Sequence, residues 1–185
     1  MRILVAGAGG VLGRATLPHL GPHDVVALTR TRDKVQLLHD LGARAIVCNV
    51  YDYSDLLRVA QDAEPQIVVD FVTDLATQSP DANNRVRREG TANLVNAATM
   101  ANASRFVAES VAFPLDGDAG EAVEQLERAA CEFVGESVIL RFGRLWGPGT
   151  WHRAPPEPPA IDVERAGVEA SRLLVEARPG IYLVA

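Results

Sequence analysis

The sequence contains few cysteines, no long apolar run and no concentration of positive charge. Its two cysteines, Cys48 and Cys131, are far apart and form neither a CxxC pair nor a Cys/His ligand spacing. This arrangement argues against a zinc site, so we expect no bound metal and two reduced, buried thiols. The first apolar run, residues 3–6, is too short for a signal peptide, and no stretch approaches the roughly 18 apolar residues of a membrane span. We therefore expect a cytoplasmic protein without a membrane partner.

The balance of charge restricts the partners further. The formal net charge is −6 at pH 7. A protein that binds nucleic acid neutralises phosphates with a basic stripe, and no such stripe is visible here. The densest basic stretch, at Arg85, Arg87 and Arg88, is followed by Glu89 and is typical of a solvated helix face. Nucleic acid is therefore not an expected partner.

What remains is an ordinary globular composition, with 185 residues, 48% hydrophobic and 23% charged. A chain of this length buries roughly 70% of its unfolded surface and needs no disulfide or metal to hold it. We expect one domain over residues 1–185. One segment stands out, Gly147 to Ala160, because it carries five prolines. Proline removes backbone donors and fixes φ, so this segment is expected to be an extended loop.

Short apolar runs alternate with longer amphipathic ones along the chain. The expected strands are 3–7, 25–29, 45–48, 67–72, 105–108, 138–140 and 181–184. The expected helices are 11–20, 33–41, 54–60 (capped by Ser54), 83–100, 121–134 and 163–177. Because the strands are continuously apolar, they should be parallel and buried on both faces. The pattern predicts a doubly wound α/β sheet of the Rossmann type with about seven strands and a ligand at their carboxyl ends.

The first strand runs directly into a glycine-rich turn, Gly7-Ala8-Gly9-Gly10-Val11-Leu12-Gly13. The GxGxxG pattern fails, because Leu12 stands where it requires its third glycine, whereas Gly7, Gly10 and Gly13 fit the related pattern GxxGxxG. The physical requirement is the same, namely a tight turn, close approach of a pyrophosphate and a helix packed on the strand. The helix start also presents free N–H groups to phosphates. The predicted cofactor-binding residues of the turn are Gly7, Gly9, Gly10, Val11, Leu12 and Gly13.

The end of the second strand bears on the choice of cofactor. A site that prefers NAD places an acidic residue there to accept a hydrogen bond from the ribose 2′-OH. This strand instead ends in Arg30 and Arg32, which would attract a 2′-phosphate, with Arg14 as a further candidate. The sequence therefore favours NADP(H) over NAD(H). The alternative is that these arginines are merely exposed.

These motifs together resemble the extended and atypical short-chain dehydrogenase/reductases, the group of NAD-dependent epimerase/dehydratase and NmrA-like proteins. The matching stretches span nearly the whole chain and are ILVAGAGGVLGR, VVALTRTRDKVQLL, GTANLVNAATMANASRFVAES, VILRFGRLWGPG and PAIDVERAGVEASRLLVEARPGIYLV. The resemblance implies that Asp52 contacts the adenine. It also implies that Val72 and Thr73 line the nicotinamide half of the cofactor site.

The departures from this family concern catalysis. Its members use a tyrosine four residues before a lysine, preceded by a serine, to exchange a proton while hydride moves. Aligned through Glu132 and the strand VILRF, the tyrosine position falls on Glu124 and the lysine position on Arg128. The serine position falls on Val111, which leaves Ser110 one residue early. No tyrosine occurs between Tyr53 and Tyr182, so the usual hydride-transfer machinery is absent.

The chain also departs in length from the family, whose members place a substrate-binding lobe between the GPG turn and the final helix. Here only the proline-rich loop, 147–160, stands in that place. A substrate must therefore be small, or be held by a second subunit, or not exist.

Four residues are candidates for catalysis: Glu124, Arg128, Ser110 and Asp74. Glu124 and Arg128 lie at i,i+4 and can pair, either as an acid/base group with a ribose-holding cation or as a plain surface ion pair. Asp74 follows the fourth strand and is an acid candidate on the cleft side. His152, in the proline-rich loop, could supply acid/base chemistry from a covering loop or be an ordinary surface histidine.

Three classes of function follow. The first is an NAD(P)(H)-dependent oxidoreductase or epimerase-like enzyme acting on a small substrate. The second is a non-catalytic NADP(H)-sensing regulator with a protein partner, and the third is a lyase or isomerase that uses the fold without hydride transfer. A homodimer is plausible through the helices 83–100 and 121–134. The apolar residues Val123, Leu126, Ala130 and Phe133 would support that dimer or equally cover the sheet.

Overall fold

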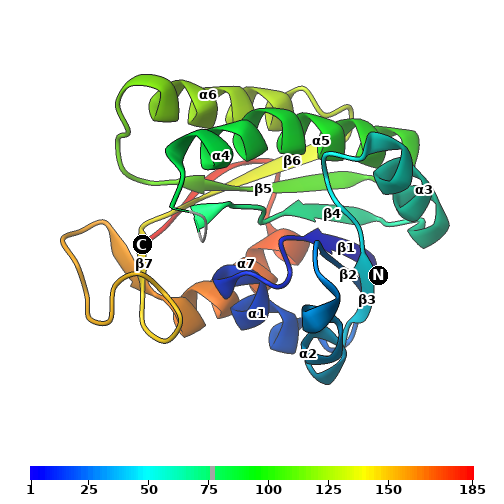
Figure 1. Ribbon diagram of the computed structural model, residues 1–185, viewed down its shortest axis with the longest axis horizontal. Coiled ribbons are helices and arrows are strands. Elements are labelled where there is room, and N and C mark those ends of the chain that lie inside the picture. The colour runs from blue at the N-terminus through cyan, green and yellow to red at the C-terminus, as the bar shows by residue number, and fades with distance from the viewer. Residues whose placement is uncertain (76–77) are drawn as a thin grey trace.

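The computed structural model describes residues 1–75 and 78–185 and contains a seven-stranded parallel sheet (Figure 1). The strand order is β3-β2-β1-β4-β5-β6-β9. These strands are β1 (Arg2–Ala6), β2 (Asp24–Thr29), β3 (Arg44–Val47), β4 (Ile67–Asp70), β5 (Arg105–Val111), β6 (Glu136–Phe142) and β9 (Gly180–Val184). The order reverses direction between β1 and β4, as in a doubly wound sheet, so the predicted fold class is confirmed.

Helices cover both faces of this sheet. One face carries α1 (Val11–Thr16), α2 (Val35–Asp40) and α7 (Val163–Glu176), and the other carries α3 (Tyr53–Ala63), α4 (Pro80–Arg85), α5 (Thr91–Met100) and α6 (Gly117–Cys131). Short 3-10 turns, Leu17–Leu20 and Arg32–Lys34, extend the two small helices of the first face. This two-sided cover explains why the strands are apolar throughout rather than in alternation.

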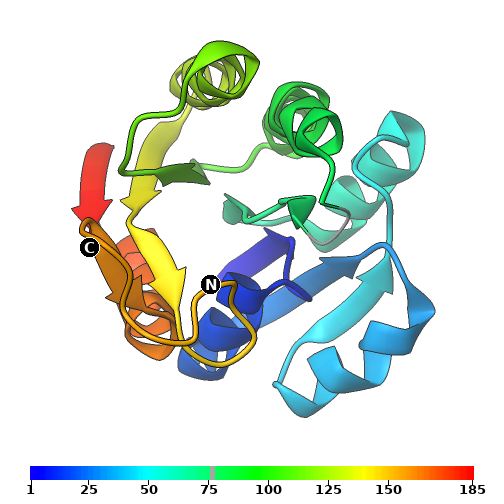
Figure 2. The same ribbon diagram turned by 60° about the vertical axis from the view of Figure 1, so that its left-hand side comes forward.

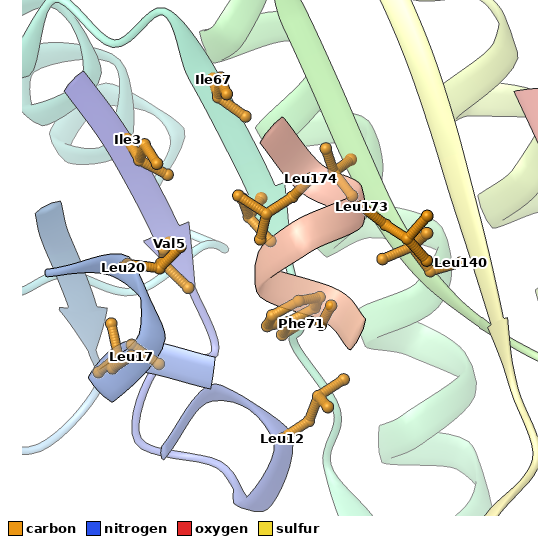
Figure 3. Packing of buried hydrophobic residues seen from close by; sticks show 14 of the residues in the cluster. Ile3, Val5, Leu12, Leu17, Leu20, Ile67, Phe71, Leu140, Leu173 and Leu174 are labelled. Carbon is orange, nitrogen blue, oxygen red and sulfur yellow. The ribbon is translucent and has the colours of Figure 1, made fainter. Parts of the chain in front are cut away.

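The first-face core lies between the sheet and the helices α1 and α7 (Figure 3). Leu173 and Leu174 of α7 pack over β4 and β6, while Leu12 and Leu17 extend the same layer beneath β1. Helix α7 approaches α1 closely because Gly167 has no side chain, and a Cβ there would lie 2.3 Å from the Ala15 carbonyl oxygen. This close packing fixes the helix that follows the glycine turn.

The second-face core corrects the expectation of an exposed apolar surface on α6. Leu126, Ala130 and Phe133 are buried, and the Phe133 ring lies 5.8 Å from that of Phe106 in β5. Only Val123 of the four is partly exposed. These side chains therefore cover the sheet, which was the other possibility for them.

Two helix boundaries differ from expectation. Asp52, not Ser54, caps α3, and its side chain accepts a hydrogen bond from the Asp55 N–H. The helix expected at 83–100 begins at Pro80, after the Ser79 cap, and is interrupted by a π-helical turn, Val86–Gly90. The π turn adds a residue to one turn and so changes which side chains face the sheet.

The prediction of two buried thiols is wrong for one of them. Cys48 is buried, but Cys131 is exposed at the last turn of α6. Met100 and Val134 are also 55% and 79% exposed, because each lies at or past the end of its helix. None of the helices in residues 1–75 and 78–185 is long and apolar enough to cross a membrane.

The proline-rich segment forms a loop between two short paired strands, β7 (Arg144–Trp146) and β8 (Ala160–Asp162). The loop passes next to α1, as Figure 2 shows. At Gly149 a Cβ would lie 3.3 Å from Arg14 Nη2, so the loop meets the helix that follows the glycine turn. Trp151 is 74% exposed and His152 is half-buried, with a bridge from His152 to Trp146.

Candidate functional site

The glycine turn forms a cradle that admits no side chains at its key positions. Gly7 has φ +77°, and a Cβ there would lie 2.2 Å from the Phe71 carbonyl oxygen. Glycine is required at position 7 for two reasons. Its backbone is left-handed, and a side chain there would collide with the backbone that follows β4. The turn is closed by a hydrogen bond from Gly10 N–H to the Gly7 carbonyl, 2.9 Å.

The helix after the turn is packed against it equally tightly. A Cβ on Gly13 would lie 2.6 Å from the backbone of Gly7 and Ala8. Gly10 precedes α1 without a side-chain cap, so the first N–H groups of the helix have no capping side chain. Val11 is half-buried and Leu12 points into the core, so these two residues supply backbone rather than side chain.

Lys34 is a neighbour of the turn that the sequence analysis missed. Its ammonium group donates to the Gly9 carbonyl at 3.2 Å. Its side chain crosses Gly9 so closely that a Cβ there would lie 2.7 Å from Lys34 Cδ. A cation therefore lies over the turn where a pyrophosphate would bind.

Arg30 is the predicted 2′-phosphate ligand, and it forms an ion pair with Asp74. Its guanidinium donates to both carboxylate oxygens, at 3.1 and 3.2 Å. The Asp74 side chain is buried and that of Arg30 is half-exposed. Asp74 is positioned further by its own N–H, which donates to Asn83 Oδ1 at 2.9 Å. The structure thus joins two residues that the sequence placed in separate roles.

The other predicted cofactor residues are exposed around this pair. Arg32 is exposed in the turn after β2, and Arg14 is exposed and donates to the Gly10 carbonyl at 3.3 Å. Asp52 is exposed and its carboxylate caps α3. Next to them, Arg85 stacks on the Tyr51 ring at 4.4 Å. These positions surround the carboxyl ends of β2 and β3, where the adenosine half of a dinucleotide is expected.

The carboxyl end of β4 carries a buried acid, Asp70, which is 2% exposed. Its oxygens accept from Thr91 Oγ1 at 2.6 Å and from the Val72 N–H at 3.0 Å. Burial raises the pKa of Asp70 to about 6, although both hydrogen bonds act to lower it. Val72 is half-buried and Thr73 is exposed, so the predicted nicotinamide-side residues follow directly after this acid.

A second acid, Glu109, lies one residue beyond the strand position that pairs with Asp70. Burial raises the pKa of Glu109 to about 8, the charge of Asp70 adds to the rise, and Arg87 opposes it. Burial in turn lowers the pKa of Arg87, which lies half-buried in the π turn, while Glu109 raises it. Within residues 1–75 and 78–185, neither the Glu109 carboxyl nor the Arg87 guanidinium has a hydrogen bond or an ion pair within 4 Å.

Ser110 belongs to a different network on the opposite side of β5. Its hydroxyl donates to Glu127 Oε1 at 2.5 Å, and Arg141 holds the same carboxylate at 2.8 and 2.6 Å. Although burial favours a higher pKa for Glu127, hydrogen bonds from Arg141 and Ser110 hold that pKa below its ordinary value. The acid on α6 that meets β5 is therefore Glu127.

Glu124 and Arg128, the residues aligned with the family's tyrosine and lysine, do not join the hydrogen bonds around Glu127 in the described chain. Glu124 and Arg128 are both exposed on α6, and no ion pair joins them in the part of the chain that the structure describes. Val111, at the predicted serine position, is half-buried at the end of β5. His152 lies in the loop between β7 and β8 rather than at the ends of β4 and β5.

The residues present fit a dinucleotide. The glycine cradle has no room for side chains, Lys34 and Arg30 supply positive charge beside it, and buried acids follow at β4 and β5. Sequence analysis missed Lys34, Asp70, Arg87 and Glu109. Asp70 and Glu109 could have been noticed, because each is a carboxylate within an apolar strand, in IVVD and in RFVAES.

Comparisons with known proteins agree with this geometry. The family described as NAD(P)H-binding matches residues 7–132. A Streptomyces protein, 3-diazoavenalumate denitrifying reductase, is 34% identical over 180 residues, which cover 81% of this chain and 58% of that protein. The chain therefore spans little more than half the length of this relative.

Solved structures share the fold at low identity. The enzyme WbmG of Bordetella bronchiseptica, in complex with NAD and UDP, is 21% identical with a TM-score of 0.79, and the match covers 100% of this chain and 72% of that chain. A Bacillus halodurans protein assigned to the NAD-dependent epimerases/dehydratases is 19% identical with a TM-score of 0.81, covering 98% of this chain and 91% of that one. The UDP-glucose 4-epimerase of Thermotoga maritima, with UDP-glucose, is 16% identical with a TM-score of 0.79, covering 100% and 76%.

Proposed function

The chain belongs to the NAD(P)H-binding family, and from that premise we propose that it is an NAD(P)H-dependent reductase of a small substrate. The observation that carries the proposal is the turn at Gly7, which only glycine fits and which leaves the first N–H groups of α1 open to a pyrophosphate. A reduced nicotinamide supplies hydride when it is bound. The chain's own residues hold the cofactor, exclude water and exchange protons.

NADP(H) is the proposed cofactor, in preference to NAD(H). Arg30 stands at the end of β2, and its only recorded ion-pair partner in the described chain is Asp74. A 2′-phosphate carries more charge than one carboxylate and binds the same guanidinium fork, so it would compete with Asp74 for Arg30. Arg32 is exposed beside it and adds positive charge.

The Streptomyces relative supports a reductase rather than an epimerase. The name of that relative describes a reductase that removes nitrogen from a diazo compound. Where such a compound reacts as its diazonium cation, hydride would form the new C–H bond while the C–N bond breaks and its electron pair leaves with N₂, so this substrate would need no proton donor. A chain without the family's tyrosine is suited to an electrophile of this kind, and the short loop at 147–160 suits a small one.

A second function, cofactor sensing without turnover, is favoured by one observation. The positions aligned with tyrosine and lysine, Glu124 and Arg128, are exposed and unpaired in the described chain. In that case NADP(H) would bind and alter contacts with a protein partner. Turnover of NADPH with any electrophile separates this regulator from the reductase.

The test is calorimetric titration of the purified chain with NADPH and, separately, with NADH. We expect NADPH to bind at least about tenfold more tightly, which corresponds to about 1.4 kcal/mol. Arg30→Ala should remove most of that preference, and Asp74→Asn should strengthen NADPH binding several-fold because it removes the competing carboxylate. Arg44→Ala, an exposed arginine at the opposite end of β3, is the matched control.

Two results would contradict the proposal. Equal or tighter binding of NADH, unaffected by Arg30→Ala, would show that the NADP(H) preference is wrong. Binding of neither cofactor would overturn the reductase and the sensor together.

A further inference from the structure

The cluster of Asp70, Glu109 and Arg87 is unused by cofactor binding as proposed above. Asp70 ends β4 and pairs in register with Ala108, so Glu109 is the next residue along β5 at the carboxyl edge of the sheet. Arg87 approaches from the π turn between α4 and α5. All three groups lie near the carboxyl ends of β4 and β5, where Val72 and Thr73 follow β4, and the charges of Asp70 and Arg87 both act on Glu109.

The two acids of this cluster differ in how they are held. Asp70 is fixed by Thr91 Oγ1 and the Val72 N–H, which bind its ionised form. Glu109 has no hydrogen bond in the described chain, and the residue as a whole is only partly buried. Asp70 is suited to remain a fixed negative charge, whereas Glu109 is free to contact a ligand.

The charges that act on Glu109 come from two elements. Asp70 on β4 disfavours its ionisation, and Arg87 in the π turn favours it. Together with burial, which is the largest cause, they raise the pKa of Glu109 to about 8. Burial also raises the pKa of Asp70, to about 6, against two hydrogen bonds that lower it. Neighbouring acids with perturbed pKa values are typical of functional sites. At pH 7 Glu109 is therefore mainly protonated and Asp70 mainly ionised.

We propose that Glu109 contacts the nicotinamide half of the bound cofactor and is the catalytic residue that exchanges a proton there, in place of the missing tyrosine. The inference rests on the proposed function, because it needs a nicotinamide cofactor in the glycine cradle. Arg87 and Asp70 are positioning residues, since they set the charge of Glu109 without touching the ligand.

In the proposed step Glu109 gives up one proton and later regains it from solvent. The carboxyl is protonated while the cofactor is reduced, and the O–H bond breaks once hydride has left and a positive charge has formed beside it. The electron pair of that bond stays on the Glu109 oxygen as carboxylate. The proton goes to the atom of a carbonyl or imine substrate that has become negative, or to solvent where the substrate needs no proton. Glu109 is then reprotonated from solvent.

The experiment compares the dissociation constants of NADP⁺ and NADPH by calorimetry between pH 6 and pH 10, without any substrate. An ionised carboxylate beside the ring favours the cationic, oxidised cofactor. We therefore expect NADP⁺ to gain about tenfold relative to NADPH as the pH rises through the pKa of Glu109, which is what a shift of one pKa unit implies. Glu109→Gln should remove this pH dependence and leave both cofactors binding.

Two further variants make the direction of the effect testable. Asp70→Asn removes a negative charge and should move the inflection to lower pH, whereas Arg87→Met removes a positive charge and should move it to higher pH. Glu132→Gln, an exposed acid at the end of α6, should change nothing. The opposite signs distinguish a charge effect from loss of folding.

The outcomes separate this inference from the proposed function. If both cofactors bind and their ratio is independent of pH, or if Glu109→Gln keeps the pH dependence, Glu109 is not beside the nicotinamide. If neither cofactor binds, the proposed function fails first, and the inference falls with it.

Discussion

Charged residues are paired differently in the two parts of the candidate site, which we assign to the adenosine and the nicotinamide of the cofactor. On the adenosine side, Arg30 and Asp74 neutralise each other through two hydrogen bonds. On the nicotinamide side, Asp70 and Glu109 lie on neighbouring strands, and the nearby Arg87 forms no ion pair with either in the part of the chain that is described. The first half is arranged for binding, because its charges already have partners that a ligand can replace.

The second half is the one to which we assign the proton transfer. A buried carboxyl has a raised pKa unless a cation pairs with it closely enough to offset its burial. Glu127 of α6 shows the paired behaviour on the other face of β5, where Arg141 and Ser110 bind its carboxylate and its pKa is lowered. The difference between Glu109 and Glu127 therefore lies in their neighbours and not in the residue type.

We expect the largest effect from a substitution in the glycine turn, where the backbone alone forms the binding site. Gly7→Ala should lower the free energy of unfolding by about 3 kcal/mol, because it combines a left-handed φ with a collision against Phe71. Dinucleotide binding should be lost as well. Urea denaturation followed by circular dichroism measures the first quantity and calorimetry the second.

Gly21→Ala is the matched control for this change. Gly21 has helical φ and ψ, and a Cβ there would meet nothing within 4 Å. It should leave stability within about 0.5 kcal/mol of the parent chain. Equal losses at Gly7 and Gly21 would show that the cradle has no special packing requirement.

The next effect concerns the nicotinamide half and depends on pH. The pKa of Glu109 is raised in the folded chain from 4.5 to about 8. Because the ionised form is disfavoured by folding, stability is lost as the pH rises through this window, by up to roughly 1.4 kcal/mol per unit. Relative to the parent chain, Glu109→Gln should therefore gain about 3 kcal/mol at pH 7 and nothing at pH 4. Urea midpoints measured across this range check the sign, and a constant difference would contradict it.

The smallest effect tests the paired acid for comparison. Glu127→Gln should cost about 1–2 kcal/mol at pH 7, because it weakens charge-assisted hydrogen bonds from Arg141 and Ser110. Glu124→Gln, three residues away on the exposed side of α6, should cost less than about 0.5 kcal/mol. If thermal denaturation ranks these two variants in the reverse order, the assignment of Glu127 to the Ser110 network is wrong.

The adenosine half was accessible from the sequence because its signal is local. Gly7, Gly10 and Gly13 sit at fixed spacing after an apolar strand, and Arg30 ends the next one. The fold class, a parallel sheet with helices on both faces, followed from the alternation of apolar runs along the chain. What the sequence did not show was the bond between Arg30 and Asp74, since the two are 44 residues apart and meet only across the sheet edge.

The residues of the nicotinamide half could not be predicted from the sequence, because they come together only in the folded sheet. Asp70 and Glu109 each sit in an apolar strand, and only the pairing of β4 with β5 brings them together. The search for a replacement acid by alignment led instead to Glu124, which the fold leaves exposed. Helix phase was the second obstacle, because the π turn at Val86–Gly90 shifts every later position of the 83–100 segment.

That π turn has a consequence for how such a site arises. One extra residue in a helical turn rotates the following side chains by roughly 100° about the axis. A single-codon insertion can therefore carry an arginine from the solvent side of a helix to the inside of a cleft without adding a strand, a loop or a domain. In this chain Arg87 lies half-buried in the π turn, where Glu109 raises its pKa, whereas its neighbours Arg85 and Arg88 form ion pairs with Glu89 and Asp118. Changes of reaction within one fold can begin with insertions as small as this.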